Sequence, residues 1–321
     1  MTVSNFASHM GGVGKTAGAH NMKVVSFVSH KGGVGKTTSA YNVASAISYV
    51  VAPAKGREAA RVLFIDLDES CDGTRMFAPE YDGSQDMCSE LGVKSLYDFF
   101  TGPDDRQSLL SCICQTSNPG ISVLLGSSRN QSLAEISQND INQLRRRLSV
   151  IADDFDVCVI DCPPARGYTQ LMAMFASDVI IPCSDISFGG LTGVKNALAD
   201  IDSLMKKYSS YSVSVSTILV RSFPPVTGVN EENEIFAKDR GASWYLAELA
   251  KITSLSPTFL RNDPLFVTNL REKGLSVYSN PQKALTKQYA AVVVELIEIY
   301  FGLELRQPPY SPFAVFYPSN K

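Results

Sequence analysis

The sequence predicts an α/β protein whose mainly parallel, twisted sheet has helices on both faces. Segments with strand patterns alternate along the chain with segments of helical spacing, which is typical of parallel strands joined through helices. Two strand patterns are apolar runs that end in aspartate, and another ends in a glycine-rich turn. Strands of this kind are buried on both faces and carry their polar ends to one edge of the sheet.

Length and composition limit the classes of protein that fit. The 321 residues suffice for one large α/β core or two modest ones, and 45% hydrophobic with 19% charged residues is a globular composition. No apolar run approaches the roughly 20 residues that span a bilayer, and no leader-like segment opens the chain, so we expect a cytoplasmic location. The net charge of -3 argues against a uniformly basic nucleic-acid binder.

Seven cysteines are scattered through the sequence without a C-x-x-C pair. Neither an iron–sulfur nor a zinc site is therefore indicated. The close pair Cys112 and Cys114 has the spacing of one strand face, and we favour packing over redox chemistry there.

The first predicted strand, residues 24–29, runs into the sequence KGGVGKTT at residues 31–38, and a helix follows from Thr37. Glycines have no Cβ, so successive backbone N–H groups can turn inward and form an anion-binding nest at a helix N-terminus. The loop residues expected to hold phosphates are Lys31, Gly32, Gly33, Val34, Gly35, Lys36, Thr37 and Thr38. Lys36 is placed to reach the β- and γ-phosphates and Thr37 to ligate Mg²⁺.

Residues 2–22 repeat residues 23–43 at a constant offset of 21. The upstream copy has Met10 where the second copy has Lys31, and Asn5 interrupts its strand pattern. A partial duplication is the simpler explanation of this repeat, and a second nucleotide-binding site is the functional alternative. We expect residues 1–22 to be an extension that carries a degenerate loop.

The second strand pattern, residues 61–68, ends in the alternating pair Asp66 and Asp68. Residues 70–93 are polar and glycine-rich, and we expect a surface excursion there. A short helix from Ser95, a strand at residues 121–125 and a helix over residues 133–151 follow.

The strand pattern at residues 155–164 ends in Asp161, which is followed by Cys162 and two prolines. Further strands are predicted at residues 176–182 and 216–220, the latter ending beside Arg221. Residues 289–300 form the last predicted helix. The tail, residues 303–321, holds four prolines and is incompatible with an amphipathic helix.

Together the KGGVGKTT loop, the aspartate pair and the strand that ends in Asp161 resemble the deviant Walker A loop ATPases of the ParA/MinD family. The resemblance covers about residues 22–302 and implies a P-loop NTPase fold, with an ATPase domain over residues 23–302. In that family the early lysine, here Lys31, reaches across an ATP-sandwich homodimer to the partner's nucleotide. Glu69 and Ser70 stand where the family usually has Pro and Gln.

The resemblance also implies roles for individual residues. Lys31, Lys36 and Asp68 would be catalytic, and Asp68 would orient the attacking water, although it could also cap the following segment. Thr37, Asp66 and Asp161 would hold Mg²⁺ beside ATP, and Arg221 would lie near the base.

The leading functional hypothesis is a ParA-like partition ATPase. ATP would promote dimerisation, the dimer would bind DNA without sequence preference on the nucleoid, and a ParB-like adaptor or centromere-binding protein would stimulate hydrolysis. The candidate DNA contacts are Arg271, Lys273, Lys283 and Lys287. One alternative is a MinD-like membrane-surface ATPase, which the proline-rich tail disfavours. The others are a cargo-positioning ATPase and a nucleotide-binding regulator without turnover. The missing cysteine pairs disfavour a redox or metal-delivery member of the family.

Overall fold

The computed structural model describes residues 22–51, 59–81, 84–90, 92–118, 120–221, 240–256, 258–273, 275–280 and 283–303. The degenerate upstream loop, Gly274 and the proline-rich tail beyond Leu303 lie outside the described residues. None of the helices within the described ranges combines the length and the apolar character needed to cross a membrane.

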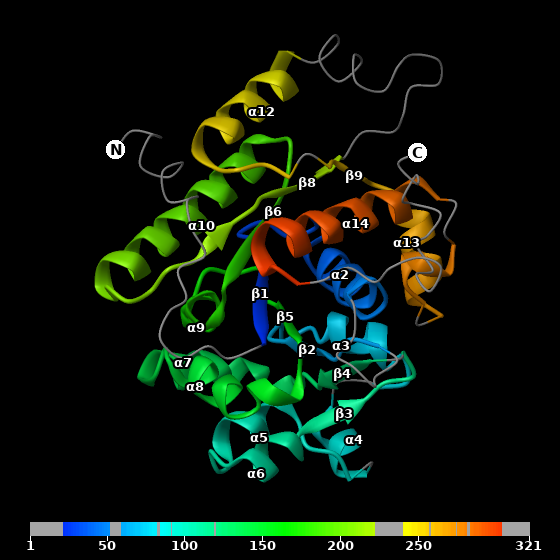
Figure 1. The fold of residues 1–321 in the computed structure, drawn as a ribbon, viewed down its shortest axis with the longest axis vertical. Coiled ribbons are helices and arrows are strands. Elements are labelled where there is room, and N and C mark those ends of the chain that lie inside the picture. Colours follow the sequence, from blue (N-terminus) through cyan, green and yellow to red (C-terminus); the bar gives the residue numbers. More distant parts are fainter. Residues whose placement is uncertain are drawn as a thin grey trace.

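A single sheet, mostly parallel, runs through the described part of the chain (Figure 1). Its strands lie in the order β3-β4-β2-β5-β1-β6-β8-β9, with β7 beside β6. Only the β3–β4 pair among the described pairs is antiparallel. The strands are β1 (Lys23–Val28), β2 (Val62–Asp66), β3 (Ile113–Gln115), β4 (Ile121–Leu124), β5 (Val157–Asp161), β6 (Val179–Asp185), β7 (Ser214–Val215), β8 (Ile218–Arg221) and β9 (Leu260–Arg261).

Helices cover both faces of this sheet, as the sequence predicts (Figure 1). The α-helices are α2 (Lys36–Val50), α3 (Asp72–Phe77), α4 (Gln85–Glu90), α5 (Leu96–Thr101), α6 (Arg106–Leu110), α7 (Leu133–Asn139), α8 (Gln143–Val150), α9 (Tyr168–Ala176), α10 (Phe188–Lys207), α12 (Arg240–Ile252), α13 (Pro264–Arg271) and α14 (Ala284–Glu295). Short 3₁₀ turns lie at η2 (Ser128–Ser132), η3 (Ala152–Asp154) and η4 (Val277–Ser279), and the π-helical turn η5 (Leu296–Phe301) extends α14.

Side chains of successive strand residues point into two separate hydrophobic cores, because they alternate between the faces of a strand. Val25 and Phe27 of β1 join the core beneath α2, α3 and α14. Val24 and Val28 join the core beneath α5, α8, α9 and α10. This two-faced burial is why β1 reads as a continuous apolar run in the sequence.

Two sequence predictions are wrong. Residues 70–93 are not a surface excursion, because Met76, Phe77, Tyr81 and Cys88 are buried in the core beside α2. The helices that hold them, α3 and α4, are too short to show helical periodicity. The single helix expected over residues 133–151 is two helices, because the Asp140 side chain accepts a hydrogen bond from the Asn142 N–H and competes with the helical pattern.

All seven cysteines are free in the structure, and six of them are buried. Cys114 lies in β3, and Cys112 is buried directly before that strand. The two cysteines therefore do not share one strand face as the sequence predicts, because Cys112 belongs to the core beneath α5 and α8 and Cys114 packs against the core beneath α2 and α3.

Three central parallel strands bring the predicted site to one edge of the sheet. β1 lies between β5 and β6, and β5 lies between β1 and β2. Asp66 of β2 and Asp161 of β5 are register partners across that ladder. The loop after β1 therefore emerges beside the carboxyl ends of β2 and β5, where ligands bind in open α/β sheets.

Candidate functional site

The loop after β1 turns through two glycines in the left-handed region of backbone conformation. Gly33 and Gly35 both have φ of 76°, where a Cβ atom would strain the backbone. Gly35 directly precedes α2, and no side chain caps the start of that helix. Because the first N–H groups of a helix lack intrahelical partners, this terminus favours an anion.

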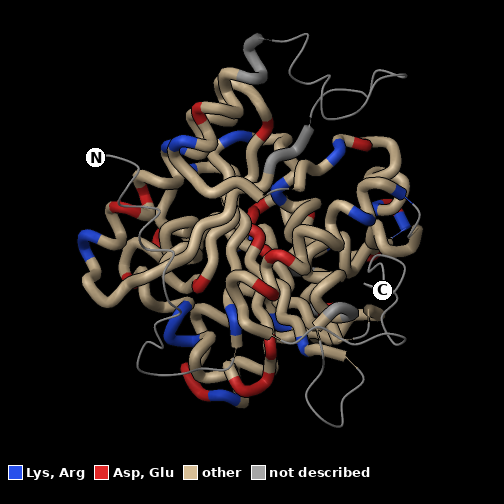
Figure 2. The backbone as a smooth tube through the Cα atoms, turned by 45° about the horizontal axis from the view of Figure 1, so that its top comes forward, with Lys and Arg blue, Asp and Glu red and all other residues tan. Residues whose placement is uncertain are grey.

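Lys36 is buried among acidic side chains from two strands. Its Nζ lies 2.5 Å from Asp161 Oδ1 and 3.9 Å from Asp68 Oδ2, and its side chain is 7% exposed. The same ammonium donates to Thr37 Oγ1 at 3.3 Å. Figure 2 shows acidic positions toward the middle of the molecule. The fold thus brings together residues that lie far apart in the sequence.

The pKa values of this group follow from burial and from the excess of negative charge. Burial alone would lower the pKa of Lys36, but Asp161 more than offsets it, so that pKa lies above its ordinary value. Burial and the neighbouring Asp161 raise the pKa of Asp66 to about 7. Burial also raises the pKa of Asp161, although the Lys36 ammonium opposes it. One ammonium faces three carboxylates, counting Asp68, and a divalent cation would neutralise the remainder.

Asp66 makes contacts that shape the loop after β2. Its Oδ1 accepts from the Asp68 N–H at 3.1 Å and its Oδ2 from the Thr74 N–H at 2.7 Å. The residue is fully buried. Backbone donors thus fix both oxygens of Asp66, and its role as a metal ligand stays a prediction.

Asp68 presents one oxygen to the following turn and the other to Lys36. Its Oδ1 accepts from the Ser70 N–H at 3.0 Å, as the capping interpretation expects, while Oδ2 is the atom nearer Lys36. Asn130 fixes this backbone from the other side, since its Nδ2 donates to the carbonyl oxygens of Asp66 and Asp68 at 3.1 and 3.0 Å. The carboxylate is held in place at the mouth of the acidic group.

Lys31 contacts the junction between β6 and α10 of its own chain. Its Nζ donates to the Asp185 carboxylate and, at 3.1 Å, to Ser187 Oγ. Ser187 also begins α10, where its Oγ accepts from the Gly190 N–H at 3.1 Å. About a third of the Lys31 side chain, 35%, is exposed but only 16% of the Asp185 side chain, so this pair is partly buried.

A divalent cation fits the oxygen atoms beside Lys36. Asp161 Oδ2 is buried and has no hydrogen-bond partner among the described residues, although buried carboxylate oxygens are nearly always paired. Within the described ranges, no group of three or more His, Cys, Asp or Glu side chains is arranged to hold a metal. The few oxygen atoms beside Lys36 suit Mg²⁺, because Mg²⁺ commonly takes one or two protein oxygens and completes its shell with phosphate and water.

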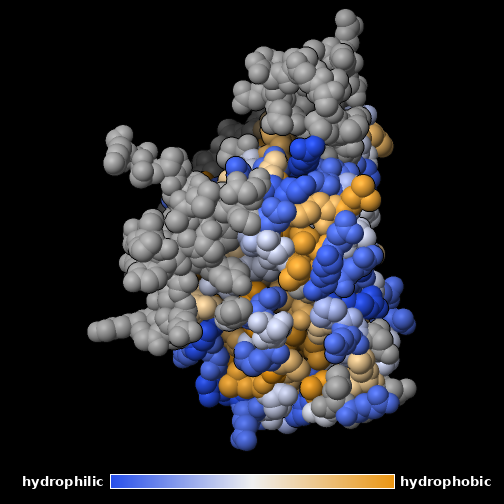
Figure 3. Space-filling model, turned by 90° about the vertical axis from the view of Figure 1, so that its right-hand side faces the viewer, coloured by the Kyte–Doolittle hydropathy of each residue, from blue (hydrophilic) through white to orange (hydrophobic). Residues whose placement is uncertain are grey.

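The other predicted residues lie in or beside β8, α13 and α14. Arg221 ends β8, where its backbone pairs with Arg261 of β9, and its side chain is not among those described. The candidate DNA contacts, all exposed, are Arg271, Lys273, Lys283 and Lys287. The Arg271 guanidinium also binds Asp72 of α3. Figure 3 shows that the side of the molecule carrying α13 mixes apolar and hydrophilic side chains.

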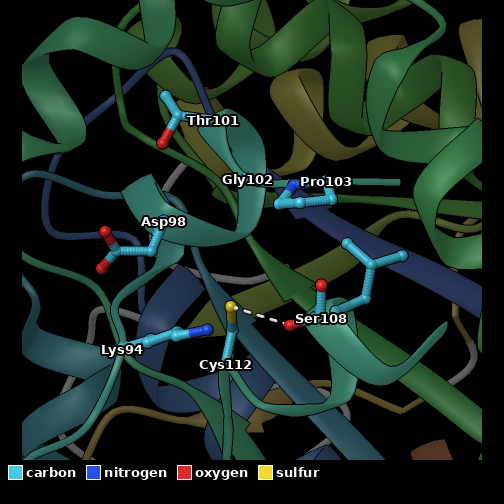
Figure 4. Close-up of a pocket in the computed structure, with 8 residues that line it drawn as sticks. Lys94, Asp98, Thr101, Gly102, Pro103, Ser108 and Cys112 are labelled. Carbon is cyan, nitrogen blue, oxygen red and sulfur yellow. Dashed lines mark hydrogen bonds between the residues drawn. The ribbon is translucent and has the colours of Figure 1, made fainter. Parts of the chain in front are cut away.

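A small cavity of about 190 Å³ lies between α5 and α6 (Figure 4). It is lined by Lys94, Asp98, Thr101, Gly102, Pro103, Ser108, Leu109 and Cys112. Figure 4 shows the Lys94 amine beside Cys112, whose Sγ donates to the Ser108 carbonyl at 3.5 Å. None of the predicted site residues lines this cavity, so it is separate from the loop.

A family model described as an AAA domain matches residues 22–213, more than half of the 321 residues. The chain belongs to the ParA/MinD-like P-loop ATPase family. The match includes the loop, Asp66, Asp68 and Asp161, and it ends shortly before β7.

Known proteins and solved structures agree with a ParA/MinD-like chain. It is 26% identical over 156 residues to the sporulation initiation inhibitor protein Soj of Bacillus subtilis, covering 46% of this chain and 57% of Soj. A McdA–ATP complex from Cyanothece superposes with a TM-score of 0.67 at 18% identity, covering 89% of this chain and 99% of that one. The septum site-determining protein MinD of Pyrococcus horikoshii with Mg-ADP gives 0.60 at 18% identity, covering 86% and 96%.

Those two superpositions establish a shared ParA/MinD-like fold. The chain spans about 51 to 62% of the length of curated relatives that it matches.

Sequence reasoning missed three residues that the ParA/MinD-like fold places next to the site. Asp185 holds Lys31, Asn130 fixes the backbone at Asp68, and Gln170 contacts the residue before Lys31. Asp185 ends an apolar strand just as Asp66 and Asp161 do, so its position was readable from the sequence. Asn130 lies in a turn and Gln170 in a helix, and nothing in the sequence around either residue indicates that it contacts the site.

Proposed function

We propose that this protein is a ParA-type partition ATPase that binds ATP with Mg²⁺, dimerises around the nucleotide and contacts DNA in that state. Hydrolysis, stimulated by a ParB-like adaptor, would release it. The observation that carries the proposal is the buried Lys36 between Asp161 and Asp68 at the end of a glycine loop that opens with Lys31.

In this proposal the backbone N–H groups of residues 32–38 and the Lys36 ammonium hold the phosphates of ATP. Lys36 exchanges its contact with Asp161 for the phosphates. Thr37 Oγ and the carboxylates of Asp161 and Asp66 would then hold Mg²⁺, and Asp66 also keeps the loop in shape through its two backbone contacts. When bound, Mg²⁺ supplies neutralisation of the charge on the phosphates.

Asp68 orients the attacking water in the proposed reaction. Phosphoryl transfer depends chiefly on positioning and electrostatics, and Asp68 offers an oxygen on the side of Lys36. The Ser70 N–H holds this carboxylate, and Asn130 fixes the backbone that carries it.

Lys31 acts in the dimer. Its contact with Asp185 is open to solvent on the Lys31 side, so the ion pair is partly screened and contributes on the order of 1 kcal/mol. Exchange of that partner for a phosphate of the other subunit's ATP therefore costs little. The dimer would be stable only with the nucleotide bound.

The exposed basic residues of α13 and the start of α14 are the proposed DNA contacts. Dimerisation would pair two such surfaces, which is how a chain of net charge -3 could bind DNA only in its ATP state. Arg271 has its own-chain partner Asp72, so Lys273, Lys283 and Lys287 are expected to contribute more.

The experiment that tests this function is co-sedimentation of the full chain with plasmid DNA and, separately, with anionic liposomes, each with and without Mg-ATP. We expect ATP-dependent pelleting with DNA, little dependence on DNA sequence and a steep loss of binding as salt rises. An ATP-bound chain without DNA affinity even at low salt would contradict the partition function. ATP-dependent pelleting with liposomes alone would favour the MinD-like alternative.

A further inference from the structure

His30, the residue before Lys31, is buried in a polar cluster between α9 and α10. Its Nε2 lies 2.5 Å from Gln170 Oε1 and 3.8 Å from Asp200 Oδ2, and its side chain is 5% exposed. Gln170 and Asp200 are buried as well. His30, Gln170 and Asp200 form the His30 cluster, which is distinct from the acidic group around Lys36.

The hydrogen bonds fix the orientation of the His30 ring. Gln170 uses its Nε2 to donate to the Pro163 carbonyl at 3.3 Å, so its Oε1 is the acceptor for the ring. His30 must therefore carry its proton on Nε2 and donate from it. His30 Nδ1 is buried without a hydrogen-bond partner among the described residues. The hydrogen bond to Gln170 is thus the one that orients the ring among the described residues.

The His30 cluster also holds the segment after Asp161. Residues 164–168 are exposed. Two side-chain contacts tether this segment: Gln170 donates to Pro163, and Arg166 Nε donates to both Asp200 oxygens at 2.9 and 3.0 Å. Both tethers end on a residue that faces the His30 ring. The ring therefore sits where the phosphate loop and the segment after Asp161 are joined.

We propose that His30 is a positioning residue that couples the entrance of the phosphate loop to residues 163–168, so that Lys31 and the chain after Asp161 are set together when ATP binds. This inference rests on the proposed ATPase function. ATP would draw Lys36 away from Asp161, and the change at Asp161 passes to Pro163 two residues later. Gln170 carries it to His30, whose backbone continues directly into Lys31.

Kinetics of the full-length protein separate this role from simple packing. In the steady-state hydrolysis of Mg-ATP, His30→Ala is expected to lower kcat about tenfold, because the two halves of the site lose their relative alignment, while KM stays within about twofold. His30→Gln, whose amide N–H can still donate to Gln170, is expected to recover most of kcat. Tyr211→Phe is the matched control, since it removes a buried hydrogen bond to the Met174 carbonyl of α9 without touching the His30 cluster.

Arg166→Ala supplies a second variant, and urea unfolding checks that it folds, because the Arg166 side chain is 60% exposed but its partner Asp200 is only 4% exposed. It is expected to lower kcat several-fold at unchanged KM, and its effect should not multiply with that of His30→Ala, since both act through one cluster. Wild-type kinetics in Arg166→Ala overturn the coupling, as does a His30→Ala loss that His30→Gln fails to recover. A wild type that hydrolyses no ATP would contradict both the proposed function and the coupling. An active wild type with unaffected variants would contradict the coupling alone.

Discussion

Lys36 Nζ lies 2.5 Å from Asp161 Oδ1, so a lysine at the start of α2 is paired with a carboxylate 125 residues later in the chain. The pair is buried at the carboxyl edge of the sheet, where Asp161 ends β5, the strand between β1 and β2. In the proposed function, Lys36 would bind the phosphates of ATP and Asp161 would bind Mg²⁺. The pair therefore keeps both charges compensated until the nucleotide replaces it.

Lys36→Ala is expected to weaken Mg-ATP binding by more than about 100-fold, equivalent to about 3 kcal/mol, because the phosphates lose their only buried cation from the loop. Isothermal titration calorimetry measures it. Lys195→Ala, an exposed lysine on α10, is the charge-matched control and should bind as the wild type does. Affinity retained in Lys36→Ala would remove the loop from the nucleotide site.

Asp68→Ala is expected to bind Mg-ATP with near wild-type affinity and to hydrolyse it slower by on the order of 100-fold, since the water loses its orienting oxygen while the phosphate cradle is intact. Single-turnover phosphate release gives the rate, and Asp72→Ala, four residues on and half-exposed, controls for loss of an acidic charge. Equal rates in Asp68→Ala and the wild type would move the role to another residue.

The Asp66 carboxyl predicts a pH dependence of stability. Burial raises its pKa to about 7 from an unfolded value of 3.8, so the folded chain binds its proton more tightly than the unfolded chain. Its contribution to stability is present below pH 3.8 and is lost as the pH rises toward 7, with a slope of about 1.4 kcal/mol per pH unit. Urea unfolding of the wild type and Asp66→Asn between pH 5 and 7, with a chelator present, measures the difference. Parallel curves for the two proteins would contradict the assignment.

Gly120 tests the turn that starts β4. Its φ is 77°, and a Cβ there would lie 2.3 Å from the Ala60 carbonyl oxygen. Gly120→Ala is therefore expected to lower the free energy of unfolding by about 2 kcal/mol or more, through strain and a backbone clash together. Gly92→Ala, at φ 64° with nothing within 4 Å, should cost only the strain of about 1 kcal/mol. Equal losses in the two variants would show that the clash relaxes.

Much of this arrangement was predictable from local sequence. The apolar runs at β1, β2 and β5 and the KGGVGKTT loop predict a parallel sheet with a phosphate-binding edge, because burial on both faces and missing Cβ atoms leave a direct mark on residue choice. The family resemblance, confirmed by the domain match, added the expected roles of Asp68 and Lys31.

Other parts depend on contacts between distant segments, which leave no periodic signal. α3 and α4 are a single turn or two of helix whose buried residues look scattered in the sequence. The position of Asp66 at a strand end predicts a metal ligand, but it does not predict that the Asp66 oxygens also bind the N–H groups of Asp68 and Thr74. The contact of His30 with Gln170 joins residues 140 positions apart.

The central claim is that ATP joins two copies of this chain through Lys31. Light scattering of the full-length protein with a non-hydrolysable ATP analogue and Mg²⁺ measures it most directly, with Lys31→Ala beside the wild type. We expect a monomer mass for both proteins without nucleotide and a dimer mass for the wild type with it. Lys31→Ala is expected to keep a monomer mass even though calorimetry shows the analogue bound. A Lys31→Ala protein that dimerises as the wild type does, or a wild type that stays monomeric at saturating nucleotide, would contradict it.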